Sequence, residues 1–228
     1  GYDATEVQWR PFWHLLPPEG VPVARADFEQ RCRDKRPARH ESSLVTKSGG
    51  RRWIAWTNTT ACADNGEVEF VIETGIDLTE QEQARTALAW EAGVNAAVAE
   101  LSGALISLAS VDEISALVLE QAQRLTGSAY GFVGYIDTQT GSLVAPTMTR
   151  DIWDVCQVEG KEAVFHEFRG LWGWVLNRRQ SILTNHPTVD ARSSGVPAGH
   201  IPVQRFLAAP AVLGNTLVGL VALANPSR

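Results

Sequence analysis

Cysteine is scarce in this chain of 228 residues, and its thiols form no pattern. Cys32, Cys62 and Cys156 are an odd number and lie far apart, and none has a second cysteine at the spacing of a zinc site. This usage argues against a fold stabilised by disulfides or zinc. It predicts reduced thiols in a cytoplasmic protein.

An excess of basic charge and long apolar runs are also lacking. Lysine and arginine total 20 against 26 aspartates and glutamates, a net charge of −6, so no basic field attracts nucleic acid. The longest apolar runs, near residues 206–213 and 217–224, are too short to cross a bilayer. We therefore expect neither a nucleic-acid partner nor a membrane span within this sequence.

Recognisable catalytic motifs are missing as well. The sequence contains no phosphate-binding loop, no Gly-x-Ser-x-Gly and no His-Glu-x-x-His. The glutamates of the first half alternate with apolar residues, as on a solvated strand face. No segment that binds ATP or accepts a phosphoryl group in kinases is present. We expect this chain not to be an enzyme by itself.

Three strands joined by tight turns are predicted in the first third of the chain. The turns contain Gly49-Gly50 and Asp64-Asn65-Gly66, residues that tolerate positive φ. Val68, Phe70 and Ile72 alternate with glutamates, and this period of two predicts that the apolar side is buried. The strands are expected at residues 39–47, 51–62 and 68–73, after a helix at residues 27–36.

Residues 75–80, Gly-Ile-Asp-Leu-Thr-Glu, close the third strand and open a long helix without a break. A strand that runs directly into a helix leaving its domain can pass a conformational change along the chain. We therefore regard this corner as a signal joint.

Residues 1–80 resemble the later part of a PAS sensor domain. The resemblance rests on Lys47-Ser48-Gly49, on Arg52-Trp53-Ile54 and on residues 75–80, which are similar to the Asp-Ile-Thr signature that ends PAS domains. It implies a partial PAS-like domain over residues 1–79, with the first two strands of the family missing. It also implies that Asp77 and Thr79 hydrogen-bond around the corner and that Asp77 pairs with a base such as Arg52. Ordinary capping of the helix by Thr79 is an alternative role for that residue.

Residues 79–109 contain no proline and show heptad spacing. Positions 87, 94, 101 and 108 form one apolar seam, and positions 84, 98 and 105 form a second, which Glu91 interrupts. Such spacing lets a helix pair with a copy of itself, so we predict a parallel homodimer through residues 79–109. The alternative is a single amphipathic helix packed on its own domain. In either case residues 80–109 are the predicted connecting signalling helix.

Helix, hairpin, irregular insert and second hairpin follow in that order. Ser110 and Glu113 fit a capping box, and Gly127 suits the end of the helix that begins there. The further elements are expected as strands at 130–136, 142–148 and 181–185, a helix at 170–177, a loop at 186–200, and paired strands at 205–212 and 216–224.

Residues 96–228 resemble a GAF domain. The motifs are Gly170-Leu171-Trp172-Gly173, Thr184-Asn185, the run from Gly195 to His200, and Ala224-Asn225. They are similar to the GAF subtype found beside PAS domains in bacterial and archaeal sensor histidine kinases. The resemblance implies an α+β chain of two sensor domains, each an antiparallel sheet with flanking helices, joined by the long helix.

Aromatic and polar residues of this second half are candidate ligand-binding residues. Small-molecule pockets are mostly apolar with a few polar groups, and long irregular insertions in compact domains are usually functional. We predict a cavity between the sheet and the insert at residues 149–200; the alternative is that the aromatic rings only fill the core. The candidate lining residues are Phe132, Trp153, Cys156, Trp172, His200 and Phe206.

Cys156 and His200 also suggest haem as a candidate cofactor. Thiolate and imidazole both ligate haem iron, although the Cys-x-x-Cys-His attachment motif is absent. Some sensors with GAF domains of this general type bind haem, which the resemblance brings to this chain. His200 is the preferred axial ligand, and a buried structural cysteine is the alternative role for Cys156.

The sequence therefore predicts a cytoplasmic sensory module of a two-component signal-transduction protein, most simply a histidine kinase. It would sense a small molecule in the second domain and transmit the signal through the helix of a homodimer. A haem-based redox or gas sensor and a dimerisation module without a ligand are the alternatives. The cofactor, if there is one, stays open.

Overall fold

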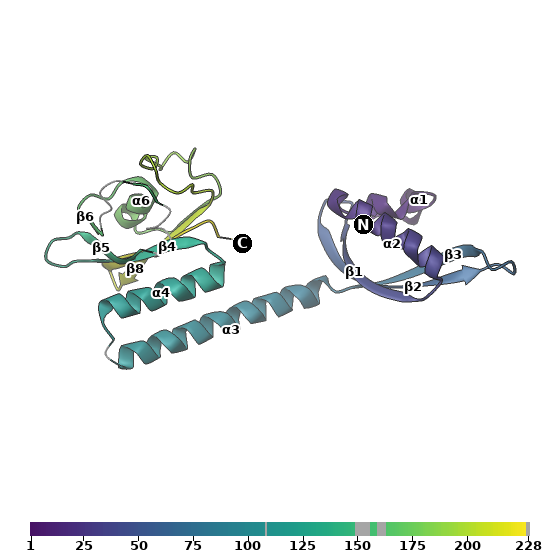
Figure 1. The fold of residues 1–228 in the computed structure, drawn as a ribbon, viewed down its shortest axis with the longest axis horizontal. Coiled ribbons are helices and arrows are strands. Elements are labelled where there is room, and N and C mark those ends of the chain that lie inside the picture. The colour runs from purple at the N-terminus through teal and green to yellow at the C-terminus, as the bar shows by residue number, and fades with distance from the viewer. Residues whose placement is uncertain (108, 149–155, 159–162, 227–228) are drawn as a thin grey trace. The chain divides into compact units, whose positions relative to one another are not determined.

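The computed structural model describes residues 1–107, 109–148, 156–158 and 163–226 (Figure 1). It divides into two compact units, Gly1–Ala89 and Trp90–Arg228. Helix α3 (Thr79–Ile106), 28 residues long, belongs to both. The expected class is confirmed: each unit contains an antiparallel sheet with flanking helices, and a long helix links the two.

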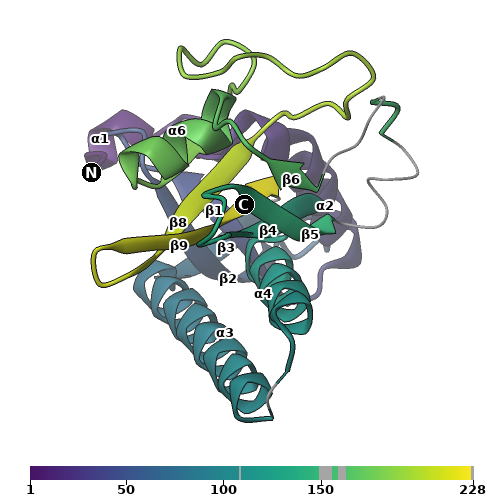
Figure 2. The same ribbon diagram turned by 90° about the vertical axis from the view of Figure 1, so that its left-hand side faces the viewer.

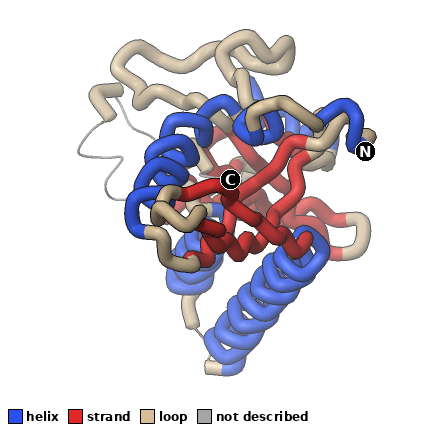
Figure 3. Tube along the Cα trace, turned by 90° about the vertical axis from the view of Figure 1, so that its right-hand side faces the viewer, coloured by secondary structure: helices blue, strands red, loops and turns tan. Residues whose placement is uncertain are grey.

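The first unit is a three-stranded sheet with helices on one face (Figures 1 and 3). The strand order is β1-β2-β3 with antiparallel pairing, as the turn signals predicted. Helix α2 begins earlier than expected, because Pro22 fits the first turn of a helix and does not interrupt it. The elements are α1 (Ala4–Val7), η1 (Phe12–Leu15), η2 (Pro18–Gly20), α2 (Val21–Asp34), β1 (Ala38–Val45), β2 (Arg51–Cys62) and β3 (Val68–Asp77).

The buried face of this sheet is not the one predicted from β3. Phe70 and Ile72 are 60% and 55% exposed, so the expectation that they are buried is wrong. The covered face carries Trp56, whose ring meets Phe12 of η1 edge-on at 5.3 Å. Glu73 of β3 lies on that same face and pairs with Arg31 of α2. The alternation of apolar and polar residues shows which side chains share a face of the strand. It does not show which of the two faces the helices cover.

In the second unit, helix α4 (Val111–Thr126) packs along α3 (Figure 2). The predicted capping box between Ser110 and Glu113 is present, and Gly127 ends the helix in the left-handed conformation. The two helices approach closely at Gly93, where an added β-carbon would lie 3.1 Å from a methyl group of Leu125. Further along, Gln121 donates a 2.7 Å hydrogen bond to Glu100.

A six-stranded antiparallel sheet forms the centre of this unit, in the order β6-β5-β4-β9-β8-β7. Side chains alternate along β9: Leu220 and Ala222 belong to the core beneath α6, and Leu223 to the core beneath α4. Helices α4 and α6 therefore cover opposite faces, as Figure 2 shows. The elements are β4 (Tyr130–Ile136), β5 (Leu143–Met148), β6 (Val164–Phe165), α6 (Gly170–Arg178), β7 (Ile182–Thr184), β8 (Phe206–Leu213) and β9 (Thr216–Ala224).

Candidate functional site

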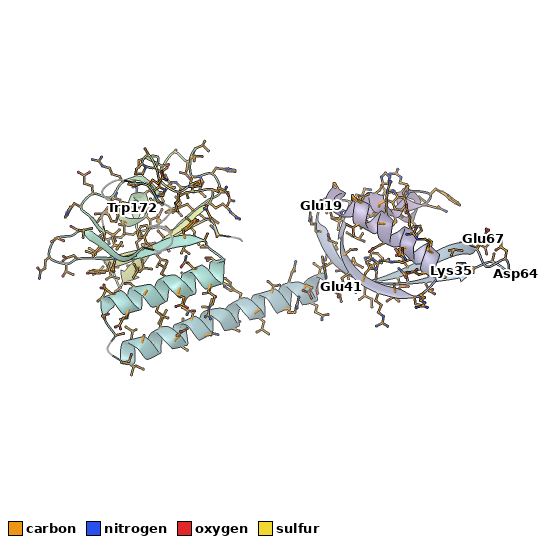
Figure 4. All side chains as sticks on the ribbon, viewed as in Figure 1. Glu19, Lys35, Glu41, Asp64, Glu67 and Trp172 are labelled. Carbon is orange, nitrogen blue, oxygen red and sulfur yellow. The ribbon has the colours of Figure 1, made fainter. Side chains whose placement is uncertain are left out.

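Three of the candidate ligand-binding residues meet on the α6 face of the sheet. Phe206 on β8 is buried, and Phe132 on β4 packs against the same core cluster. Trp172 of α6 joins them from the helix side, and its ring lies 5.2 Å from that of Phe165 (Figure 4). Alanines at 208 and 222 occupy the strand positions between the rings. Such small side chains leave room for large ones above the middle of the sheet.

Cys156 and His200 lie on segments that are joined by a backbone hydrogen bond. The amide of Gln157 donates to the carbonyl oxygen of Gly199 at 2.9 Å. Cys156 is buried, and His200 is half-buried. The remaining candidate, Trp153, lies outside the described residues. The structure thus places the candidates in two groups, and their joint role in one cavity stays a prediction.

The tautomer of His200 is set by its neighbour. Its Nδ1 lies 2.8 Å from the carbonyl oxygen of Ile201. A carbonyl oxygen only accepts hydrogen bonds, so Nδ1 carries the proton in the neutral ring and Nε2 presents its lone pair. This is the arrangement found in histidines that bind a metal or accept a hydrogen bond from a ligand. Among the described residues, no group of three or more His, Cys, Asp or Glu side chains forms a metal site.

The loop at residues 186–200 is fastened to the outer side of α6. The Arg192 guanidinium lies over the Trp174 ring at 5.0 Å, and it donates 2.8 and 2.7 Å hydrogen bonds to Asp190. One turn earlier on the helix, an added β-carbon at Gly170 would lie 2.7 Å from the Ser194 hydroxyl. Helix α6 therefore separates this part of the loop from the sheet.

The Asp190 carboxylate is the electrostatic centre of this loop anchor. Hydrogen bonds from the side chain and then the backbone of Arg192 hold the pKa of Asp190 far below its ordinary value. The same contact raises the pKa of Arg192. Sequence reasoning missed this pair, and the Asp-x-Arg spacing in a loop was the only available signal.

The motif residues of the second unit have structural tasks close to the site. An added β-carbon at Gly173 would lie 2.2 Å from the Phe168 carbonyl carbon, so only glycine lets α6 follow that turn so closely. The Asn225 side chain accepts from the Gln204 amide at 2.7 Å and donates to the Pro202 carbonyl at 3.1 Å. These bonds fix the entry into β8 just after the segment that carries His200.

The corner between β3 and α3 is held by hydrogen bonds of Asp77, Thr79, Leu78 and Trp53. Asp77 accepts from the Thr79 amide at 2.9 Å. The Thr79 hydroxyl accepts from the Trp53 amide on β2 at 2.8 Å, and the Leu78 amide donates to the Trp53 carbonyl at 2.8 Å. Arg52 lies 3.7 Å from Asp77, in an exposed ion pair. Bonds from the Thr79 side chain and backbone lower the pKa of Asp77. The geometry expected around the corner is present, and the signalling role of Asp77 and Thr79 stays a prediction.

Comparison with known proteins identifies both halves. The family model described as GAF domain matches residues 109–228.

The chain belongs to the GAF domain family.

Residues 1–83 match the PAS fold model, so the predicted order of PAS followed by GAF is confirmed. The GAF domain contains the aromatic cluster, Cys156, His200 and the loop anchor.

One curated relative is the methyl sulfide methyltransferase-associated sensor of Methanosarcina acetivorans. It is 26% identical over 227 residues, which are 99% of this chain and 22% of that protein. This chain therefore spans less than a quarter of the length of its relative. Two sensory domains and a relative named as a sensor support a signalling sensor module.

One solved structure shares the fold of the GAF domain. The GAF domain of a phosphoenolpyruvate-protein phosphotransferase from Coxiella burnetii matches with a TM-score of 0.51 and 16% identity, over 61% of this chain and 79% of that one. The chromophore-binding domain of Stigmatella aurantiaca phytochrome P1 matches with a TM-score of 0.43 and 14% identity, over 99% and 77%.

None of the helices in the described parts of the chain is both long and apolar enough to span a membrane.

Proposed function

We propose that this chain is the ligand-sensing and coupling part of a cytoplasmic signal-transduction protein, most simply a histidine kinase. The GAF domain senses a small molecule, and α3 carries the response. The observation that carries the proposal is the corner, where only Leu78 separates β3 from α3. The backbone of Trp53 on β2 bonds both to Leu78 and to the side chain of Thr79, the first residue of α3. A change in the position of the strand then moves the first turn of the helix.

The ligand site in this proposal is the α6 face of the GAF domain. Phe132, Trp172 and Phe206 supply apolar walls there. The Nε2 lone pair of His200 supplies a polar group that accepts a hydrogen bond. Apolar walls with one or two directed polar groups suit a small, mostly apolar ligand with a hydrogen-bond donor.

The ligand is tested on purified protein by native mass spectrometry and thermal unfolding. We expect a retained or added small molecule that raises the melting temperature, because it binds only the folded state. His200→Ala removes this binding. His186→Ala, an exposed histidine in the same loop, preserves it. Equal binding by both variants would contradict a role for His200. If the wild type binds no small molecule, the alternative of a dimerisation module without a ligand is favoured.

A haem-based redox or gas sensor is a second candidate. It is favoured by the Gln157–Gly199 hydrogen bond, which brings the segments of Cys156 and His200 together, and by the His200 tautomer. Both residues fit haem: Cys156 would attach or ligate it, and His200 Nε2 would bind the iron. A bound haem would supply reversible gas binding or electron uptake.

The haem candidate is tested by the absorption spectrum after expression with added haem. A Soret band that shifts in His200→Ala supports it. Cys156→Ala should change the covalent mass or the spectrum, whereas Cys62→Ala, an exposed thiol, should change neither. A colourless protein that does not take up haem would rule this candidate out.

Transmission in this proposal uses a parallel homodimer of α3. One face of the helix, with Gly93 and the buried Ala97, packs on α4. Val98 and Leu105, on the predicted seam, are 55% and 59% exposed. A helix with a second exposed apolar stripe suits pairing with its own copy. A ligand that favours one of two arrangements of this pair would shift the output.

A further inference from the structure

The covered face of the PAS-like sheet contains a half-buried histidine, His40, whose Nδ1 atom is buried and unsatisfied. His40 on β1 lies opposite Trp56 on β2, and the two rings stack at 6.3 Å with an interplanar angle of 21°. Its Nδ1 is buried without a hydrogen-bond partner among the residues described. Buried polar atoms are rarely left unpaired, because the loss of hydration is not compensated.

A second polar atom without a partner lies on the same sheet face as His40. Asn58, 3% exposed, sits on the same sheet face, and its Nδ2 is also buried without a partner in the described parts of the chain. An amide nitrogen only donates, so it offers no acceptor to an N–H of His40; Asn58 Oδ1 accepts from the Ala38 amide at 3.1 Å. The site therefore suits a neutral His40.

Three charged groups face His40 from the two elements around it. Arg31 and Asp27 come from α2, and Glu73 comes from β3. Arg31 donates to Glu73 at 3.4 Å and to Asp27 at 3.3 Å. Arg31 and Glu73 have side chains 14% and 21% exposed, so the bridge between α2 and β3 is shielded from solvent. Asp27 is on the same helix as Arg31, so its ion pair with Arg31 does not bridge to the sheet.

Burial, followed by repulsion from Arg31, lowers the pKa of His40, against the attraction of Glu73 and Asp27. At neutral pH His40 is uncharged. As the pH falls, the unfolded or opened form takes up the proton first, so acid favours opening. An imidazolium here would attract Glu73 and repel Arg31.

We propose that His40 is a proton-responsive site, at which protonation draws Glu73 away from Arg31 and loosens α2 from β3. The site is in the PAS half, so it goes beyond ligand sensing by the GAF domain. Glu73 precedes Asp77 on the same strand by four residues, so the bridge holds the strand that leads into the corner. Only the onward effect on α3 rests on the proposed function.

The test is amide hydrogen exchange of α2 in the whole chain between pH 7.5 and 5.5, corrected for the intrinsic rate at each pH. In the wild type, we expect the protection of residues 21–34 to decrease as the pH is lowered. For one proton, the decrease is at most about tenfold per pH unit. His40→Gln, which cannot take up a proton, should abolish this slope. His14→Gln, at an exposed histidine of the same unit, should retain it.

Glu73→Gln is the second variant, which keeps the proposal testable if His40→Gln does not fold. Without the carboxylate the bridge to Arg31 is absent, so residues 21–34 should be less protected than in the wild type already at pH 7.5. The slope itself should persist, because burial and Arg31 still lower the pKa of His40. A wild type with no slope would overturn the proposal. So would a His40→Gln protein with the slope of the wild type, or a Glu73→Gln protein in which residues 21–34 keep the protection of the wild type at pH 7.5. Exchange at residues 78–82 reports separately on the corner, so failure of the joint and failure of the proton site are distinguishable.

Discussion

The amide of Trp53 donates a 2.8 Å hydrogen bond to the hydroxyl of Thr79, the first residue of α3. The two residues are 26 positions apart. Thr79 is buried, and the carbonyl of Trp53 accepts from the adjacent Leu78 amide. One residue of β2 thus holds the start of the helix with both of its backbone polar groups. The corner is fastened to the middle strand of the sheet as well as to the strand that leads into it.

Replacing Thr79 by valine tests this fastening. The change keeps the shape of the side chain but leaves the Trp53 amide without an acceptor, at a cost of about 1–3 kcal/mol in the free energy of unfolding. Urea denaturation followed by tryptophan fluorescence measures it. Thr79→Ser retains the hydroxyl and should recover most of the loss. Thr59→Val, at an exposed threonine of the same sheet, should be nearly neutral.

The strands and helices were largely predictable because their signals are local. The capping box at Ser110, the Gly127 end and the turn pairs all act within a few residues. The bond between Trp53 and Thr79 depends on the register of β2 against β3, which local patterns do not contain. The exposure of Phe70 and Ile72 could not be predicted for the same reason. The helices that cover the other face of the sheet lie far from these residues in sequence, so no local pattern shows which face is covered.

The candidate site was predictable in part. Aromatic composition led to Phe132, Trp172 and Phe206, which share one core cluster. The loop anchor of Asp190, Arg192 and Trp174 was not foreseen, because its partners are on two elements and each alone resembles an ordinary surface residue.

Two glycines of the second unit should respond in opposite directions to alanine. Gly173→Ala puts a β-carbon 2.2 Å from the Phe168 carbonyl carbon, so we expect a loss of about 1–3 kcal/mol in the free energy of unfolding. Gly103 lies in α3 with no atom within 4 Å of an added β-carbon. Gly103→Ala should stabilise by about 1 kcal/mol through helix propensity. Urea denaturation of both variants measures these changes in the free energy of unfolding. A stabilised Gly173→Ala protein would contradict the close approach of Gly173 to the Phe168 carbonyl group.

The loop anchor should depend on the planar group of Arg192. Arg192→Lys keeps the charge but loses the stacking on Trp174 and the two-pronged contact with Asp190. We expect faster amide exchange in residues 186–200, while α4 keeps its protection. The control is Arg178→Lys, at an exposed position of α6. Unchanged exchange in Arg192→Lys would show that Ser194 and its neighbours hold the loop without the arginine.

Dimerisation through α3 should be sensitive to charge on one side of the helix only. Val98 and Ala99 are adjacent and exposed, but Val98 is on the heptad seam, whereas Ala99 faces away from both the seam and α4. Val98→Glu buries a carboxylate in the dimer and should give a monomer in light scattering at concentrations where the wild type is dimeric. Ala99→Glu adds the same charge one residue later and should leave the dimer intact. Both changes place a glutamate in the same helical turn, so any loss of helix stability should be the same in the two variants. A difference in dimerisation between them therefore reports on pairing along the seam. A monomeric wild type, or dimers of equal strength in both variants, would contradict pairing through this seam.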